Sequence, residues 1–288
     1  MNLKQLIYKR LVENEELTER LAKFYDNPAV FDTEAPSDQD EGWGGKTQYP
    51  RCDYIIDTQA NEGRSSVGTL SITVYTERTS MVILALSASI KDTFRDILLN
   101  PEGTDGPYSF AWARTDGFTL PGTNIIGQTT QFDIVEYPNQ ETTDPDPQVT
   151  LSRYLKELYP DAIVLGVDRI GDMVLSKDAP IIYTEVQRLV MSTGHNLHTI
   201  TWLDCQMSVH VLCPVKADNL KMCAAIEQNL SMEGELLMTD GSLMRINSVQ
   251  FDRKADYLRI GQITVFTHYG VVKTTPKPHT IQSININQ

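Results

Sequence analysis

The pattern of apolar and polar positions along the chain predicts the same succession of elements twice. Apolar and polar residues alternate in "SITVYT" (residues 71–76) and in "SVHVLC" (residues 208–213), which is typical of a strand with one buried face. A segment that opens with a proline, Pro50 or Pro180, precedes each of them, and the first residue of a strand can dispense with its N–H donor. We therefore predict two related pairs of strands, one in each half of the chain.

A helical pattern follows each alternating strand. Apolar residues recur there at spacings of three and four, as on a helix that buries one stripe against a sheet. The first stripe consists of Ile83, Leu86, Ile90, Phe94 and Ile97, and the second of Leu220, Cys223, Ile226 and Leu230. Each half is thus expected to place one helix on its sheet.

Two short phrases also recur after the predicted helices. "TDG" stands at residues 115–117 and 239–241, and Asp-Gly between two apolar runs predicts a tight hairpin turn at both places. "IGQTTQF" (residues 126–132) and "IGQITVF" (residues 260–266) are expected to form the closing strand of each half. Landmarks that recur in one order indicate a tandem duplication.

The predicted fold class is α+β, with two tandem copies of a mostly antiparallel sheet packed with helices. We expect the copies at residues 1–137 and 149–272. Residues 138–148, rich in Pro, Asp and Thr without apolar periodicity, are expected to be a linker. Residues 273–288 carry prolines that would break a helix and are expected to be an extended arm or a frayed end.

The composition limits the partners. Asp and Glu number 38 against 25 Lys and Arg, a formal net charge of −13, whereas gripping a nucleic acid backbone needs clustered positive charge. We expect no direct sequence-specific binding of nucleic acid. The sequence shows neither the apolar core of a signal peptide nor a segment of spanning length, so we expect a cytosolic chain without a membrane partner. The four cysteines form no CxxC pair and are expected to be reduced.

Several segments resemble chemical sites without matching them. "GWGGKT" (residues 42–47) ends like a phosphate-binding loop, but the first glycine of that motif is replaced by Asp40, whose charge would repel phosphate. We therefore expect a flexible, exposed loop over about residues 33–48 and no nucleotide. Asp38 and Asp40 could act as an acid–base pair, but on an acidic loop such carboxylates are expected to be simply solvated.

Metal binding is not expected either. His195 and His198, with Cys205 beyond them, match the spacing of no zinc module. His210 is predicted on the opposite face of its strand from Cys205 and Cys213, which removes it as their partner. With no catalytic signature in the sequence, we expect no cofactor and no enzymatic activity.

The three tryptophans, Trp43, Trp112 and Trp202, are scattered along the chain. Aromatic residues distributed in this way are expected to serve packing or an interface rather than a ligand cage.

Both halves resemble the tail terminator, or tail completion, proteins of long-tailed bacteriophages. In the first half the resemblance rests on "AVFDTEAP", "YPRCDYIID", "TLSITVYTE" and "TTQFDIVEY", and in the second on "YPDAIVLG", "APIIYTEVQ", "MSVHVLC" and "IGQITVF". It covers nearly the whole chain, once per half. Members of that family normally consist of a single copy, so the tandem arrangement departs from the family pattern.

The resemblance implies a structural role without catalysis. It implies a ring that caps the head-proximal end of the tail tube, ends its polymerisation and offers a surface for head joining. The implied partners are further copies of the chain, the tail tube protein, the sheath and the head connector. The implied location is the host bacterial cytoplasm during assembly and then the head-proximal end of a virion tail or tail-like particle.

The acidic loop is the candidate lining of the lumen or contact with the tube, because a negative lumen would not bind DNA phosphates. The candidate residues are Asp38, Asp40, Glu41, Trp43 and Lys46. Tail tubes are commonly six-fold, and the divergence of the two repeats favours six chains over a trimer of interchangeable halves.

Two other functions remain open. One is a head–tail connector, or a collar or cap protein of a contractile tail or bacteriocin. The other is a soluble cytosolic binding protein of unknown ligand, which would require a pocket with convergent polar groups.

Overall fold

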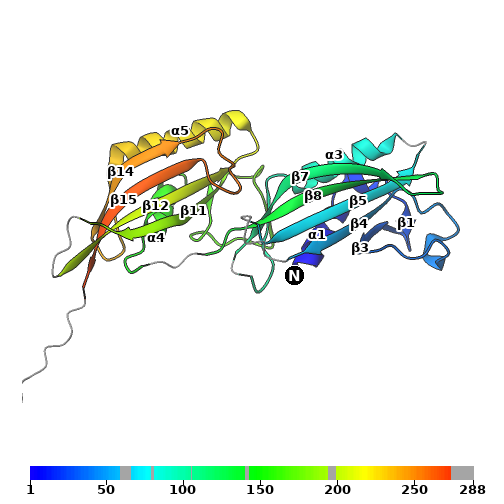
Figure 1. Ribbon diagram of the computed structural model, residues 1–288, viewed down its shortest axis with the longest axis horizontal. Helices are drawn as coiled ribbons and strands as arrows, with labels where there is room; N and C mark the ends of the chain where they lie inside the picture. The colour runs from blue at the N-terminus through cyan, green and yellow to red at the C-terminus, as the bar shows by residue number, and fades with distance from the viewer. Residues whose placement is uncertain (59–65, 79–80, 105, 140–142, 194–198, 274–288) are drawn as a thin grey trace, which may run out of the picture.

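The chain folds as an α+β protein with two curled sheets (Figure 1). The computed structural model describes residues 1–58, 66–78, 81–104, 106–139, 143–193 and 199–273. Within these ranges, no helix is both long enough and apolar enough to cross a membrane.

The N-terminal half carries a seven-stranded sheet in the order β10-β6-β7-β8-β5-β4-β3. Its helices pack on one face, where the apolar side chains of β5 and β8 point. The helices are α1 (Leu3–Val12), α2 (Glu15–Thr18) and α3 (Val82–Phe94), and the strands are β3 (Val30–Asp32), β4 (Arg51–Asp57), β5 (Gly68–Glu77), β6 (Ile97–Leu99), β7 (Tyr108–Thr119), β8 (Ile125–Glu136) and β10 (Met173–Leu175). A separate small hairpin consists of β1 (Lys23–Phe24) and β2 (Asn27–Pro28).

The C-terminal half carries a six-stranded sheet in the order β13-β14-β15-β12-β11-β9. Its elements are α4 (Pro147–Leu158), β9 (Ile163–Val164), β11 (Ile181–Met191), β12 (Ile200–Leu212), α5 (Lys216–Glu233), β13 (Glu235–Leu237), β14 (Leu243–Phe251) and β15 (Ile263–Val272). Apart from β10, each strand of the N-terminal sheet has a counterpart at the same place in the C-terminal sheet. In sheet order the pairs are β6 and β13, β7 and β14, β8 and β15, β5 and β12, β4 and β11, and β3 and β9. In both sheets the last pair, β3 with β4 or β9 with β11, is parallel.

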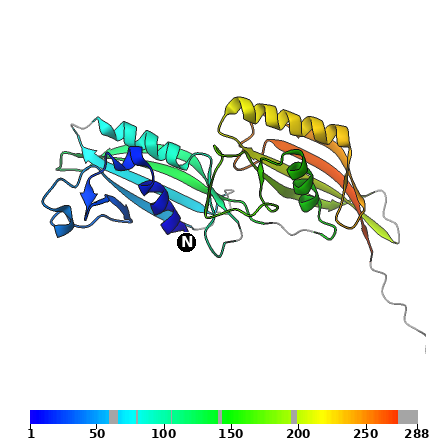
Figure 2. The ribbon, with the colours of Figure 1, turned by 180° about the vertical axis from the view of Figure 1, so that it is seen from behind.

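The two halves lie end to end, with their strands running roughly along the long axis of the molecule (Figure 1). Seen from behind, α1, α3, α4 and α5 all lie on the same side, in front of the sheets (Figure 2). The opposite faces of both sheets therefore look toward one side of the molecule, and no helix of the described residues lies over them.

The recurring "IGQ" phrases begin the closing strand of each sheet but occupy different registers. Leu70 pairs with Phe132, whereas its counterpart Met207 pairs with Val265 and leaves Phe266 opposite Gln206. Phe132 is consequently 1% exposed on the helix-covered face, while Phe266 lies on the other face. A shift of one residue turns every side chain of a strand to the other face, so the two phrases are not structurally equivalent.

Only the second "TDG" forms the predicted turn. Gly241 adopts a left-handed φ of +83° between β13 and β14. The first "TDG", residues 115–117, lies within β7 and pairs with β8, and the chain turns over residues 120–124 instead. The prediction of a hairpin turn at 115–117 is therefore wrong.

The predicted helical stripes are confirmed in their central residues. Leu86, Ile90 and Phe94 are buried on α3, and Cys223, Ile226 and Leu230 are buried on α5. The ends of the stripes differ, because Ile97 belongs to β6 and Leu220 is exposed on α5.

The predicted linker is partly helical and partly packed. α4 begins at Pro147, inside residues 138–148, because the Asp146 side chain caps the helix by accepting hydrogen bonds from the backbone N–H groups of Gln148 and Val149. The predicted tail is described only at Lys273, whose N–H donates to the carbonyl of Thr199; residues 274–288 lie outside the described residues.

The halves are joined by a third apolar cluster. Its buried residues are Leu98, Ala111, Val135, Tyr137, Leu165, Ile181, Tyr183, Leu212 and Leu258. The rings of Tyr137 and Tyr183 lie 4.9 Å apart, and the Tyr137 hydroxyl donates to the Leu258 carbonyl at 3.1 Å. Arg259 bridges Asp133 and Asp256, so a charged contact reinforces the apolar one.

The strand β10 ties the halves together as well. It follows α4 in sequence yet pairs with β6, which makes it the edge of the N-terminal sheet. Residues 149–272 therefore do not form a sheet of their own from end to end, because three of them complete the sheet of the other half.

Candidate functional site

The acidic loop is more ordered than the sequence indicates. It contains a short 3-10 helix, η1 (Glu41–Trp43), and Trp43 is only 2% exposed. The Trp43 ring packs edge-on against Phe24 at 5.0 Å and Phe31 at 5.7 Å, and its Nε1 donates to the Ser37 carbonyl. Trp43 therefore anchors the loop from inside, and the expectation that it faces a lumen or a tube is wrong.

The charged candidate residues of the loop, Asp40 included, are all exposed, and Asp40 also has a structural role. The Asp40 carboxylate accepts a hydrogen bond from the Gly42 N–H at 2.9 Å and caps η1. Asp38, Glu41 and Lys46 are exposed, and Asp38 lies 3.7 Å from Arg51. The loop sits at the end of the N-terminal half that is remote from the C-terminal half (Figure 1).

The glycines of "GWGGKT" shape this loop rather than a phosphate cradle. A Cβ on Gly42 would lie 2.3 Å from the Phe24 ring, so only glycine fits beneath the aromatic cluster. Gly44 and Gly45 have left-handed φ values of +58° and +71°, which end the 3-10 helix.

A buried charged cluster supports the loop from the sheet. The Arg51 guanidinium lies 5.2 Å from the centres of both the Tyr49 and the Tyr75 rings. Asp53, on the same face of β4, is 7% exposed, and its Oδ1 accepts no hydrogen bond. Burial raises the pKa of Asp53 to about 6, with the Glu34 charge acting in the same direction and the Arg51 charge opposing it.

The helix-free faces of the two sheets share a local design. In the N-terminal sheet the Phe118 ring covers Gly127 on the neighbouring strand and meets Tyr75 edge-on at 5.9 Å. In the C-terminal sheet Trp202 lies opposite Gly270. An aromatic ring thus covers a cross-strand glycine on each face.

Polar contacts fill the rest of these faces. The hydroxyls of Thr73 and Thr129 lie 2.9 Å apart, and Arg114 Nε donates to Gln131 at 2.9 Å. Trp202 stacks on His268, with ring centres 4.9 Å apart. Both faces therefore combine polar contacts with aromatic residues, Tyr75 and Phe118 on one face and Trp202 on the other.

The outer edge of β7 is open. β6 pairs with β7 only through Leu99 and Tyr108, so no strand of the described chain pairs along that edge from Ser109 to Thr119. Trp112 is 53% exposed on this strand, and the Lys91 ammonium lies 4.1 Å from the centre of its ring. Unpaired edges are templates for another strand, although the bulge at Ala113 and the charges of β7 limit indiscriminate pairing.

The histidines and cysteines form no site that the described residues reveal. His195 and His198 lie outside the described residues. Cys205 is buried in the core, which raises the pKa of its thiol to about 12. His210 lies on the opposite face, as predicted, with Nδ1 2.8 Å from the Tyr257 carbonyl oxygen. Within the described ranges, no three His, Cys, Asp or Glu side chains are grouped so as to hold a metal ion.

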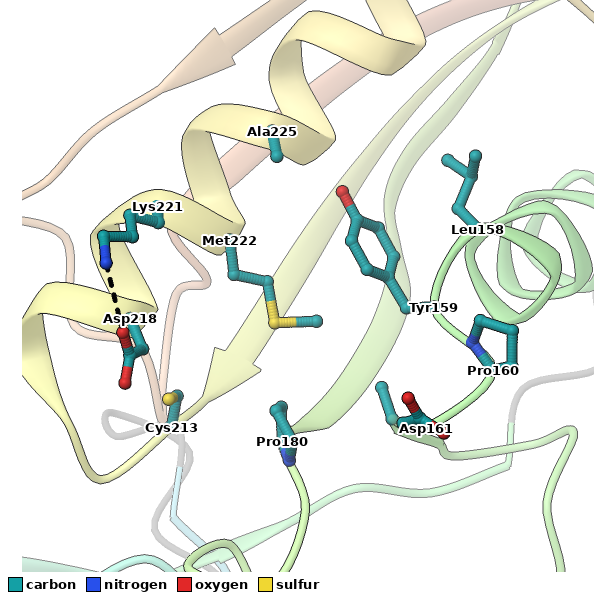
Figure 3. Close-up of a pocket in the computed structure, with 11 residues that line it drawn as sticks. Leu158, Tyr159, Pro160, Asp161, Pro180, Cys213, Asp218, Lys221, Met222 and Ala225 are labelled. Atoms are coloured by element: carbon teal, nitrogen blue, oxygen red, sulfur yellow. Dashed lines mark ion pairs between the residues drawn. The ribbon is translucent and has the colours of Figure 1, made fainter.

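Two cavities lie away from the predicted loop. A polar cavity of about 630 Å³ lies between the halves, beside Gln148, Arg169 and Tyr183. An apolar groove of about 430 Å³ lies between the end of α4 and the start of α5 (Figure 3). The sequence did not predict either cavity, because the residues that line each one come from segments that are far apart in the sequence, and no local pattern shows that these segments pack together.

Comparison of the chain with protein-family models and with curated proteins finds no match.

Proposed function

We propose that the chain is a structural component of a phage tail or tail-like particle, where it forms a ring on the head-proximal end of the tail tube, ends its polymerisation and offers a surface for head joining. The observation that carries the proposal is the pair of similarly ordered sheets, held end to end, with a long open strand edge on one of them. Such a body suits repeated side-by-side association, because an open edge and a polar sheet face are surfaces that further subunits can cover.

The arrangement of the halves supports six copies rather than three. In a trimer of interchangeable halves, the two halves of one chain would lie side by side around the ring. Here they lie end to end along the strand direction, so side-by-side association of chains would stack the halves in two tiers (Figure 1). The third apolar cluster, which includes Tyr137, and the ion pairs of Arg259 favour keeping both tiers as one rigid unit.

The acidic loop, in this arrangement, lies at one end of the two-tiered body. Asp38, Glu41 and Lys46 are then better placed to contact the tube or the head side than to line the lumen. The net charge of −13 supports a role beside DNA, because a negative surface does not retain phosphates.

A connector, collar or cap protein would use the same surfaces but bind on the head side or to the sheath. A soluble binding protein is the candidate from another class, and the polar cavity of about 630 Å³ between the halves is the observation that favours it.

The proposal is tested by locating the chain on isolated particles. Tails and tail-like particles from the producing strain would be labelled with an antibody to this chain and viewed by negative-stain microscopy. We expect the label at the head-proximal end alone, and label on free heads would assign the connector role. Label along the tube, or on no particle, would reject a terminator.

The copy number is tested on the same ring. One chain has a mass of 32.4 kDa, so a hexamer has a mass of about 194 kDa and a trimer about 97 kDa. Mass photometry of the ring released from particles separates the two, and a trimer would overturn the two-tier arrangement.

A further inference from the structure

The open edge of β7 contains a short segment that is complementary to itself. Within residues 112–119 every residue except Thr115 is exposed, and no strand of the described chain pairs on the outer side of this segment. Residues 113–117 read "ARTDG", with a small residue at each end and the basic Arg114 and the acidic Asp116 on either side of Thr115. Read in the opposite direction, the segment places acid against base at both positions.

The side chains of Arg114 and Asp116 lie on the same, helix-free face of the sheet, whereas Thr115 between them points to the other face. Arg114 Nε lies 3.2 Å from Asp116 Oδ2 and 2.9 Å from Gln131 Oε1. Among the described residues neither Nη group of Arg114 has a partner, and the two charged side chains are 68% and 63% exposed. Both Nη groups can therefore donate to a carboxylate from outside the chain.

We propose that two copies of the free chain associate through this edge, with their β7 strands antiparallel about a two-fold axis at Thr115. Arg114 then lies opposite the partner's Asp116, and Asp116 lies opposite the partner's Arg114, so that two pairs of opposite charge form across the new pair of strands. Sliding the strands by two residues keeps every side chain on its face but moves the axis to Arg114 or to Asp116. Two like charges then stand opposite each other, so the charges select one register.

The occupant of the edge is a second copy because both halves of the complementary surface belong to one segment, which is the property of a two-fold contact. The bulge at Ala113 interrupts the regular ladder, so the strand pair is short. Interfaces that bury less than about 1,200 Å² are typical of weak complexes, and we therefore expect a dimer that separates on dilution. The ring proposed above relates its copies by rotation about one axis. The two-fold dimer is thus a form of the chain outside the ring and does not depend on a role in tails.

Exchange of the two charges tests the pairing. Sedimentation equilibrium of the unaltered chain at micromolar concentrations is expected to show a dimer of about 65 kDa, twice the 32.4 kDa chain. Asp116→Arg and Arg114→Asp each set like charges across the axis, and each is expected to weaken the dimer at least about tenfold. An equimolar mixture of the two variants restores opposite charges and is expected to regain the dimer. A monomeric unaltered chain, or a mixture no more dimeric than its components, would overturn the proposal.

A disulfide tests the register in the full chain, with the partly exposed Cys213 replaced by Ser; the other three cysteines are buried. At the axis Thr115 faces the partner's Thr115, with Cα atoms about 5 Å apart, within the reach of a disulfide. Thr115→Cys is therefore expected to give a covalent dimer on a denaturing gel after mild oxidation. Thr119→Cys is the matched control, because its two copies would lie eight residues apart, roughly 26 Å at about 3.3 Å per residue. No dimer with Thr115→Cys, or as much dimer with the control, would overturn the proposal.

Discussion

Replacing Asp53 by Asn is expected to stabilise the protein near neutral pH and to flatten part of its pH dependence. The Asp53 carboxyl is buried on β4, and one of its oxygens accepts no hydrogen bond. Asn keeps the size of the side chain but needs no charge. Arg51 loses a nearby charge in the variant, but it retains Gln48 as a hydrogen-bond partner and the two tyrosine rings.

The direction and the size of the change in the free energy of unfolding follow from the pKa of Asp53. Burial raises the pKa of Asp53 from the ordinary value of 3.8 to about 6, so the folded state holds this proton more tightly than the unfolded state. Protonated Asp53 therefore contributes to the stability of the folded state. This contribution is complete below about pH 4 and is lost as the pH rises to about 6. Two pH units correspond to at most about 3 kcal/mol, and screening by nearby water reduces this to about 1 to 2 kcal/mol.

The assay is urea unfolding of the protein and of Asp53→Asn from pH 4 to pH 7.5. The free energy of unfolding of the variant, minus that of the unaltered protein, should rise by about 1 to 2 kcal/mol over this range. Glu19→Gln, which alters an exposed carboxylate, is the matched control and should give a flat difference. A flat difference for Asp53→Asn as well would refute a raised pKa of the Asp53 carboxyl.

Three further substitutions test the junction and the loop. Arg259→Met removes the ion pairs that Arg259 makes with Asp133 and Asp256 and should cost about 3 kcal/mol in the free energy of unfolding, whereas a loss below 1 kcal/mol would show that these ion pairs contribute little. Tyr137→Phe removes one hydrogen bond between the halves and should cost about 1 kcal/mol by urea unfolding; an unchanged midpoint would contradict this. Gly42→Ala drives a methyl group into the Phe24 ring and should cost about 1 to 3 kcal/mol and shift tryptophan emission to longer wavelength; an unshifted spectrum would show that the aromatic cluster adapts.

Local patterns predicted the elements whose burial depends on their own periodicity. The strands around Ile72 and Val209 and the helices around Ile90 and Ile226 appear where alternation and helical spacing place them. These strands and helices are amphipathic segments that bury one face against a neighbour, so the sequence of each segment is enough to predict it.

Register and turn position depend on partners that local patterns do not contain. Asp116 and Gly117 are residues typical of a turn, but both pair with β8. The hydrogen bonds between β7 and β8 outweigh the preference of Asp-Gly for a turn. Phe132 and Phe266 occupy matching positions in two similar phrases yet face opposite ways, because the neighbouring strand sets the register.

Contacts between distant segments were the least predictable part of the candidate site. Trp43 is buried because Phe24 in the small hairpin and Phe31 in β3 pack against it. Neither contact can be predicted from the acidic composition of the loop. The groove residues Leu158 and Met222 are likewise brought together only by the packing of two helices on one sheet.

The pairing of β10 with β6 also affects the order in which the protein is completed during synthesis. The N-terminal sheet acquires its edge strand only after Met173–Leu175 has left the ribosome, well after the rest of that sheet has been made. Until then the outer side of β6 stays exposed. Cutting the chain between the halves would therefore not release two self-sufficient domains, since one fragment would carry a strand that belongs to the other.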